Sequence, residues 1–544
     1  MKRSTVKEIN PNKVGIGNKI AFACGDIFGG GSFNIINFLF TPFLTLVVGV
    51  PMIHLTWMLL LTKIWDGIID PFIGKITDGK QPGKYGKRRY FMLICAPLVL
   101  VAFIMLFFPW NMVTNSVPLK CALVIIVYML YATAQSFVLI PYYSHASEMT
   151  DDFNERNNVN AVRIAFSIAS SIVCVAVPGL IASPTKGDNG KCYILMAGIF
   201  GVIFAVSILI TALFSREKII TPAVKTKISF KEFVRPIKVK TYRQYLGMQM
   251  CTSMAMAVMS SFFFTFCDFY IRRMSYSHLT LNGGSRFPIA TVAAAMMFVA
   301  QIFALPFYLK LIKVKSKRFA YITGALIWIG IAACMLALPA EGEISVSETG
   351  FISTVKGAPN WLIIGFGLLT GFGIGGTVFV PHSSFGDVCD VGELYFGERT
   401  EGAFSGLTNF LNTTAQAIGL AIPPLVIGLC GYVETQYLTA AEFTAKYGDV
   451  ASGATVTFND ILCKVTKGAE NVQLLPVQQT ETAQLAIRLT FTLLPIVIMI
   501  IGILIASRYK LTKNLQSKIV EANARMDKDS DEFKQKREEL LKQL

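Results

Sequence analysis

Two acidic residues within one apolar segment are the residues best placed to do chemistry in this chain. Asp66 and Asp70 lie four positions apart within residues 54–78, and Lys63 precedes them by about one helical turn. In a helix this spacing places both carboxylates on one face. Like charges repel there unless a cation lies between them or one is protonated. The spacing therefore predicts a cation site that Lys63 neutralises when the ion is absent; a structural Lys–Asp network between helices is the alternative.

A second polar group combines an acid with an arginine. Asp26 is the only acidic residue in the apolar stretch 18–48, where four glycines allow close helix approach or bending. A carboxylate that faces a cavity can accept hydrogen bonds from sugar hydroxyls. Two alternatives stay open: Asp26 simply pairs with Arg163 on another helix, or Arg163, near the start of its own helix, extends to the inner membrane surface.

The segment that begins at Gly74 combines a glycine, an acidic residue and basic residues, which is typical of a segment whose contacts change with conformation. Gly74 is expected to allow close packing against a helix of the other half of the molecule. Asp78 and a basic cluster that includes Arg88 can form a charge lock on the inner side. Breaking such a half-exposed lock should cost little.

The elements that position these residues must be membrane helices. Of the 544 residues, 53% are hydrophobic and only 15% are charged, against about 25% in soluble domains. This excludes a secreted disulfide scaffold, a disordered chain and a cytosolic enzyme, and it predicts an all-α polytopic membrane protein. Twelve transmembrane helices are expected near 18–48, 54–78, 90–110, 119–142, 159–182, 192–214, 243–271, 288–312, 319–340, 359–383, 401–430 and 485–507.

Most of the formal charge of +16 comes from lysines and arginines that lie on one side of the membrane. They concentrate in the segments that follow the even-numbered helices, which predicts that both termini are cytoplasmic. No aromatic–basic module supports a nucleic-acid partner. Four scattered histidines and the lack of a Cys-x-x-Cys pair argue against a metal site, whereas a disulfide between Cys430 and Cys463 is open. No cleavable signal peptide is expected.

An internal repeat relates the two sets of six helices. A run of three apolar residues and a proline ends at Pro141 and again at Pro381, 240 residues later, and acidic residues and a Glu-Arg pair follow each run. We expect each proline to close the fourth helix of its half. Two such halves are the plan of the major facilitator fold, which holds its substrate near the membrane midplane. The predicted units are an N-terminal bundle (1–214), a cytoplasmic middle loop (215–242), a C-terminal bundle (243–507) and a cytoplasmic tail (508–544). Within the C-terminal bundle, the outer loop 431–484 is expected to be a solvated appendage. The tail is expected to form a helix at or off the membrane surface.

Three motifs together resemble one branch of the major facilitator superfamily, the glycoside–pentoside–hexuronide cation symporters, over residues 14–430. They run Trp65-Asp66-Gly67-Ile68-Ile69-Asp70-Pro71-Phe72-Ile73-Gly74 with Gly83, Gly86, Lys87 and Arg88; Ile140-Pro141-Tyr142-Tyr143 with Glu148, Thr150, Glu155, Arg156 and Arg163; and Asp387-Val388-Cys389-Asp390-Val391-Gly392-Glu393 with Gly397, Arg399, Glu401 and Gly402.

The resemblance implies roles for individual residues. Asp66, Asp70 and Ser136 would bind the cation, and Asp26, Arg163, Tyr143 and Thr413 would line the sugar site. Lys63, Gly74, Asp78, Arg88, Glu148, Asp387, Asp390, Glu393 and Arg399 would form the charge network that changes with conformation. Three positions depart from the melibiose-type pattern: Leu139 replaces an acid, Ile69 replaces a polar neighbour of the cation, and Thr413 replaces a lysine.

These observations predict a transporter rather than an enzyme. It would import a glycoside or related sugar with Na⁺ or H⁺ by alternating access between two bundles, as a monomer in the plasma membrane, surrounded by lipid and without a cofactor. Leu139 would also suit an amphipathic or lipid-like solute on the same fold. A sensor that does not transport is the alternative from another class, although a sensor has no reason to keep two costly carboxylates in the membrane.

Overall fold

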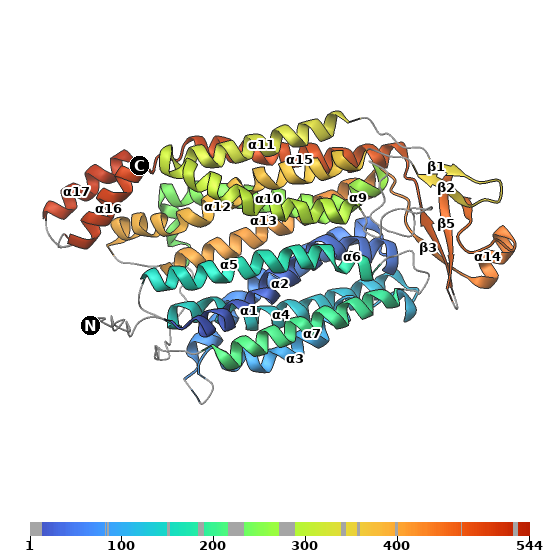
Figure 1. The fold of residues 1–544 in the computed structure, drawn as a ribbon, viewed down its shortest axis with the longest axis horizontal. Helices are drawn as coiled ribbons and strands as arrows, with labels where there is room; N and C mark the ends of the chain where they lie inside the picture. The colour runs from blue at the N-terminus through green and yellow to red at the C-terminus, as the bar shows by residue number, and fades with distance from the viewer. Residues whose placement is uncertain are drawn as a thin grey trace, which may run out of the picture.

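The fold is that of a computed structural model. It describes residues 14–81, 83, 86–149, 153–182, 190–215, 233–270, 289–338, 344–355, 359–397, 401–468, 471–525 and 531–544. Long helices run side by side through the body of the molecule, with a small sheet at one end and two short helices at the other (Figure 1).

Twelve membrane-crossing segments occur in the described part of the chain, close to the twelve expected ones. Ten are long and apolar enough to span a bilayer; the other two are α1, which π-helical turns extend, and α5, which begins with polar residues. The first half contains α1 (Ile16–Ile35) with η1 (Ile36–Phe40) and η2 (Phe43–Val48), α2 (Met52–Gly79), α3 (Arg89–Leu106), α4 (Val117–Met149), α5 (Phe153–Ala176) with the short α6 (Pro178–Ile181), and α7 (Lys191–Phe214); the second contains α9 (Lys240–Phe269), α10 (Ile289–Val314), α11 (Lys317–Ala337), α12 (Asn360–Phe396), α13 (Glu401–Leu429) and α15 (Glu481–Ser507).

Equivalent helices pack in the same way in both halves. The first helix of each half lies against the fifth and sixth, the second against the fourth, and the third against the fourth and sixth. Between the halves, α2 packs along α13 and α5 along α10. A twofold relation exchanges these two contacts, because α2 corresponds to α10 and α5 to α13. The repeat found in the sequence is therefore also a repeat of the helix packing.

The two prolines of the repeat do not close their helices, contrary to the expectation. Pro141 lies inside α4, which continues to Met149, and Pro381 lies inside α12, which continues to Phe396. In a membrane, neighbouring helices and Ser or Thr side chains can satisfy the carbonyl groups that a proline leaves free. Thr252 of α9 donates to the Thr377 carbonyl, the group that Pro381 leaves free, at 3.4 Å. The acidic residues after Pro381 therefore lie on a helix rather than in a loop.

Small residues bring α12 unusually close to α10. A Cβ at Gly367 would lie 2.5 Å from the Ala293 carbonyl oxygen, and one at Gly371 would overlap the Met297 carbonyl. Such a small-xxx-small stripe is a common way to join membrane helices without a hydrophobic driving force.

We expect Gly371→Leu to lower the thermal unfolding midpoint of the purified protein in detergent, because the new side chain must push two backbones apart. Overpacking of this kind costs about 1–3 kcal/mol or more. Gly365→Leu is the matched control on the same helix, since no described atom lies within 4 Å of a Cβ at that position. Equal midpoints for the two variants would show that the α10–α12 contact does not depend on Gly371.

The outer loop between α13 and α15 is a folded unit, not the solvated appendage expected from the sequence. Four antiparallel strands in the order β3-β6-β5-β4 carry one helix, and a hairpin from the α11–α12 connection lies beside them (Figure 1). Phe443, Val465 and Leu474 form its buried core. The elements are β1 (Ile344–Val346), β2 (Ile352–Val355), β3 (Gln436–Thr439), α14 (Ala440–Tyr447), β4 (Thr455–Phe458), β5 (Ile461–Lys467) and β6 (Asn471–Pro476).

Cys430 and Cys463 do not form a disulfide. Both thiols are free, and Cys463 is buried within the strand core of the outer unit. The apolar pattern of β5 turns this side chain inward, so Cys463 acts there as a small apolar residue.

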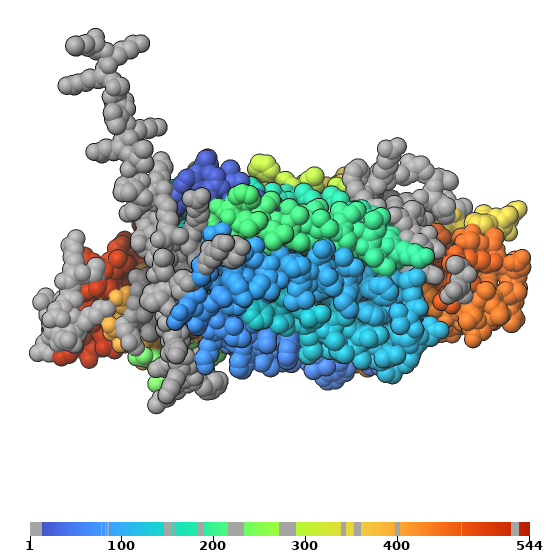
Figure 2. Space-filling view, turned by 90° about the horizontal axis from the view of Figure 1, so that it is seen from below, coloured from blue at the N-terminus to red at the C-terminus, as the bar shows by residue number. Residues whose placement is uncertain are grey.

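The C-terminal tail forms two helices that pack on the protein. Its helices α16 (Lys513–Arg525) and α17 (Asp531–Gln543) contact the inner end of α12. Gln516 donates to an Asp390 carboxylate oxygen at 2.7 Å, and Arg537 donates to the Tyr395 carbonyl. Figure 2 shows the red tail and the orange outer unit at opposite ends of the helical body.

Candidate functional site

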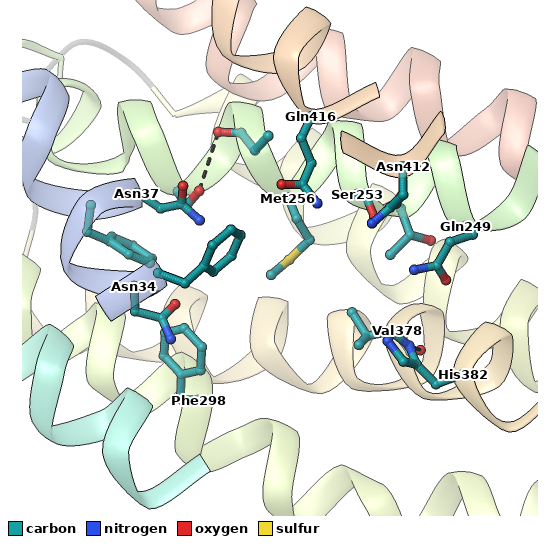
Figure 3. A pocket seen from close by; sticks show the side chains of 15 residues that line it. Asn34, Asn37, Gln249, Ser253, Met256, Phe298, Val378, His382, Asn412 and Gln416 are labelled. Atoms are coloured by element: carbon teal, nitrogen blue, oxygen red, sulfur yellow. Dashed lines mark hydrogen bonds between the residues drawn. The ribbon is translucent and has the colours of Figure 1, made fainter. Parts of the chain in front are cut away.

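A cavity of about 230 Å³ lies between the two halves. The first half contributes α1 and η1, and the second contributes α9, α10, α12 and α13. Figure 3 shows the side chains converging on this space. The lining residues are Phe33, Asn34, Asn37, Phe38, Gln249, Thr252, Ser253, Met256, Ala257, Ser260, Phe298, Val378, His382, Asn412 and Gln416.

The lining combines apolar surface with uncharged hydrogen-bonding groups and one histidine, His382. Amides and hydroxyls alternate with phenylalanine rings, and no Asp, Glu, Lys or Arg belongs to the described lining. Apolar walls with a few convergent hydrogen-bonding groups are typical of small-molecule sites. The cavity can therefore bind an uncharged solute that offers both hydroxyls and an apolar face.

Direct contacts between the halves close the cavity on its outer side. The hydroxyls of Thr41 and Ser261 lie 2.7 Å apart, one from each half. The Phe38 ring packs edge-on against Phe263, Phe264 and Phe298. This layer of rings and the hydroxyl pair separate the cavity from the outer surface.

The folded outer unit adds a second closure above this layer. The π-helical η2 leaves carbonyl groups of the first half without helical partners. Gln473 of the outer unit donates to the Leu46 carbonyl at 2.7 Å, while Lys120, on α4 of the first half itself, donates to the Val48 carbonyl at 3.0 Å. The Tyr437 hydroxyl also donates to the Leu46 carbonyl at 3.3 Å. A unit of the second half thus holds the outer end of the first helix.

The inner side is open by comparison. His382, in the inner half of α12, is exposed although it lines the cavity. Tyr143, near the inner end of α4, is 48% exposed, and Phe33 is 38% exposed. The cavity is therefore more accessible from the end of the molecule that carries the tail helices α16 and α17 than from the end that carries the folded outer unit (Figure 1).

The residues predicted for the cation site lie between α2 and α4. The Ser136 hydroxyl donates to Asp70 at 2.5 Å, and the Lys63 ammonium lies 3.4 Å from an Asp66 oxygen. The Trp65 indole donates to Thr133 at 3.1 Å, which joins α2 to α4 at a second point. The group therefore contains the Asp66 and Asp70 carboxylates, the Ser136 hydroxyl and the Lys63 ammonium, which are largely buried.

The Phe33 ring contacts this group on one side and lines the cavity on the other. The Lys63 ammonium lies 5.9 Å from the centre of the Phe33 ring and 6.0 Å from that of Tyr128. Distances of about 6 Å are within the range of cation–π attraction. Because Phe33 lines the cavity, a displacement of Lys63 changes one wall of the space between the halves.

Asp26, Tyr143 and Arg163 come together next to the cavity but do not line it. A Cβ at Gly29 would lie 2.7 Å from an Asp26 oxygen and 3.3 Å from the Tyr143 hydroxyl, so both side chains meet over this glycine. The Arg163 guanidinium lies 5.0 Å from the Tyr143 ring centre. Asp26 is 5% exposed and is within electrostatic reach of Arg163. Arg163 thus turns inward to this group instead of extending to the membrane surface.

Among the side chains that the structure describes, the acidic residues of the predicted charge network lie on α12. Asp387 forms an ion pair with Lys317 at 2.5 Å, while Asp390 accepts from the tail. Glu393 is half-buried on the same helix, and Arg88 is buried beside the start of α3. Arg399 lies outside the described residues, and so do the side chains of Asp78 and Glu148.

Gly74 does not make the close helix contact expected of it. Among the described atoms, none lies within 4 Å of the place a Cβ would take.

Sequence reasoning missed the amides that dominate the cavity. Thr413 is half-buried on α13, but its neighbours Asn412 and Gln416 line the cavity instead. The two amides are four residues apart on α13, a spacing that places both on one face of the helix. Uncharged polar residues at helical spacing were the signal that could have identified this wall.

Comparison with known proteins identifies the family and several related transport proteins. Residues 21–513 match the family described as MFS/sugar transport protein. An uncharacterized symporter, YjmB, from Bacillus subtilis is 25% identical over 79% of this chain and 86% of its own length. A glucuronide carrier protein homolog from Escherichia coli is 24% identical over 77% of this chain and 85% of its own.

The helix arrangement also resembles that of solved transporters. A bacterial homolog of the human lysosomal transporter Spinster, in an inward-facing and unoccupied conformation, superposes with a TM-score of 0.56. It covers 93% of this chain and 97% of its own, at 11% identity. At this identity the likeness concerns the fold alone.

Proposed function

Because this chain belongs to the MFS/sugar transport protein family, and is thus a multi-pass membrane transporter of the sugar/cation symporter type, we propose that it imports a glycoside or related sugar together with Na⁺ or H⁺. The observation that carries the proposal is the uncharged, hydrogen-bonding cavity between the halves, one aromatic ring away from the Asp66–Asp70 carboxylates. The substrate binds in the cavity and the cation at the carboxylates.

Coupling follows from the contacts of Lys63. A cation that binds at Asp66 and Asp70 competes with the Lys63 ammonium for the Asp66 carboxylate. The released ammonium shifts against Phe33, whose ring forms part of the sugar cavity. Occupation of one site therefore alters the other, as coupled binding requires.

Alternating access requires the closed outer side to open. The Thr41–Ser261 hydrogen bond and the phenylalanine layer around Phe38 break when the halves rock about the α2–α13 and α5–α10 contacts. The inner ends then approach, and Gly74 gains a neighbouring helix. With both termini in the cytoplasm and the protein in the plasma membrane, this cycle moves sugar inward.

The alternative substrate is an amphipathic or lipid-like solute. The cavity lining favours the sugar, because an alkyl chain would leave the amides of Gln249, Asn412 and Gln416 without partners. Each buried polar group left unpaired costs about 1–3 kcal/mol. The arrangement of a cavity beside a carboxylate pair likewise supports a carrier over a sensor.

The proposal predicts exchange of labelled glycosides across proteoliposomes that contain the purified protein. Vesicles preloaded with unlabelled methyl glycosides should take up the same labelled sugar transiently above equilibrium, since a carrier exchanges solute without a driving ion gradient. Vesicles with labelled lysophosphatidylcholine test the alternative in parallel. Exchange of the lipid but of no glycoside would replace the sugar proposal by the lipid one.

A further inference from the structure

Two amide oxygens in the cavity have no hydrogen-bond partner. Gln249 projects from α9 and is 8% exposed, and Asn412 projects from α13. The side-chain oxygen of each is fully buried and unpaired. Figure 3 shows both side chains directed into the same space, opposite Val378 and His382.

Unpaired acceptors of this kind define what a ligand must supply. Leaving a buried carbonyl oxygen unpaired costs about 1–3 kcal/mol, so most native structures contain few such groups. A hydroxyl can donate to each oxygen, whereas an ionised carboxylate only accepts. Sites built to hydrogen-bond a hydroxyl strongly reject analogues that lack it.

We propose that Gln249 and Asn412 form a subsite that selects uncharged sugars and rejects uronic acids. The inference rests on the proposed function and narrows its substrate to neutral glycosides. Sugar hydroxyls donate to the two amide oxygens, and the phenylalanine rings of the lining cover the apolar face of the sugar.

The charges around the cavity support the same choice. A uronate needs a cationic partner to be buried, but the described lining contains no lysine or arginine, and its one histidine, His382, donates through Nδ1 to the Val378 carbonyl at 2.8 Å. Two basic groups outside the lining are engaged elsewhere: Lys63 pairs with Asp66, and Arg163 lies over Tyr143 and within electrostatic reach of Asp26. The Asp26 carboxylate would also repel the carboxylate of a uronate.

The size of the cavity limits the ligand further. Its volume of about 230 Å³ is below the ~300–1,000 Å³ of sites for drug-sized ligands. The cavity therefore suits a single sugar ring with a small aglycone better than an oligosaccharide.

The test compares sugars that differ only at C6. Binding of methyl glucoside, methyl galactoside and methyl mannoside to the purified full-length protein is measured by calorimetry, each beside its own uronate. In every series that binds, we expect the neutral sugar to bind at least tenfold more tightly. Gln249→Met and Asn412→Leu should each weaken binding of the neutral sugar at least tenfold, without improving binding of the uronate.

Gln244→Met is the matched control. Gln244 lies on the same helix, is half-buried outside the cavity lining, and donates from its amide to the Arg508 carbonyl. A uronate that binds as tightly as its neutral partner would overturn the subsite, as would unchanged affinities in both amide variants. Absence of binding by any sugar of either kind would instead contradict the proposed function itself.

Discussion

Asp70→Asn is expected to abolish cation-driven accumulation of sugar while leaving sugar exchange measurable. Asp70 accepts a hydrogen bond from Ser136 and faces the same side of α2 as Asp66. An amide of the same shape keeps the helix packing but removes the charge that binds Na⁺ or carries H⁺. In proteoliposomes, accumulation under an imposed gradient should therefore fall to the level of protein-free vesicles.

Glu481→Gln is the control for the loss of a carboxylate, because Glu481 is exposed at the outer start of α15. It should accumulate sugar as the unmodified protein does. Exchange of preloaded sugar should survive in Asp70→Asn, since that reaction needs no net cation movement. Undiminished accumulation in Asp70→Asn would leave this carboxylate with a structural role only.

A disulfide across the outer closure is expected to stop transport reversibly. The hydroxyl oxygens of Thr41 and Ser261 lie 2.7 Å apart in opposite halves, so cysteine thiols at these two positions are close enough for a cross-linking test. In the Thr41→Cys/Ser261→Cys double variant, an oxidant should reduce exchange and accumulation to background, and dithiothreitol should restore both. The bond holds the outer side shut, so the cycle cannot proceed.

The two single-cysteine variants control for effects of oxidation on the eleven native cysteines. They should remain active in oxidant, and sugar should still bind to the cross-linked double variant because its inner side stays open. Transport that continues with the bond formed would show that the halves need not separate at Thr41.

The helices and the carboxylate pair were predictable because their signals are local. Runs of about twenty apolar residues define membrane helices, and the spacing of Asp66 and Asp70 fixes a shared helix face. The order of the repeated motifs likewise led to two six-helix halves, and comparison with known proteins confirms the family.

Other features depend on contacts between distant segments and could not be deduced in this way. The β3–β6 sheet lies in a polar stretch whose strands are short, and its attachment to the Leu46 carbonyl joins positions 427 residues apart. Pro141 and Pro381 read locally as helix ends, yet tertiary packing carries both helices past them.

The cavity shows most clearly where local reasoning stops. Charged residues at depth drew attention to Asp26 and Arg163, which meet beside the cavity rather than in its wall. Gln249 and Asn412 are unremarkable in sequence and become significant only because two helices aim their amides into one space. Their unpaired oxygens are a property of the assembled structure alone.

The most direct test of the central claim is whether sugar moves an ion. Proteoliposomes held without any gradient or potential receive a neutral methyl glycoside that binds the protein, and both external pH and ²²Na⁺ uptake are recorded. We predict that addition of the sugar draws one of the two cations into the vesicles, and that Asp70→Asn removes this flux. Sugar that enters the vesicles with no movement of either cation would contradict symport.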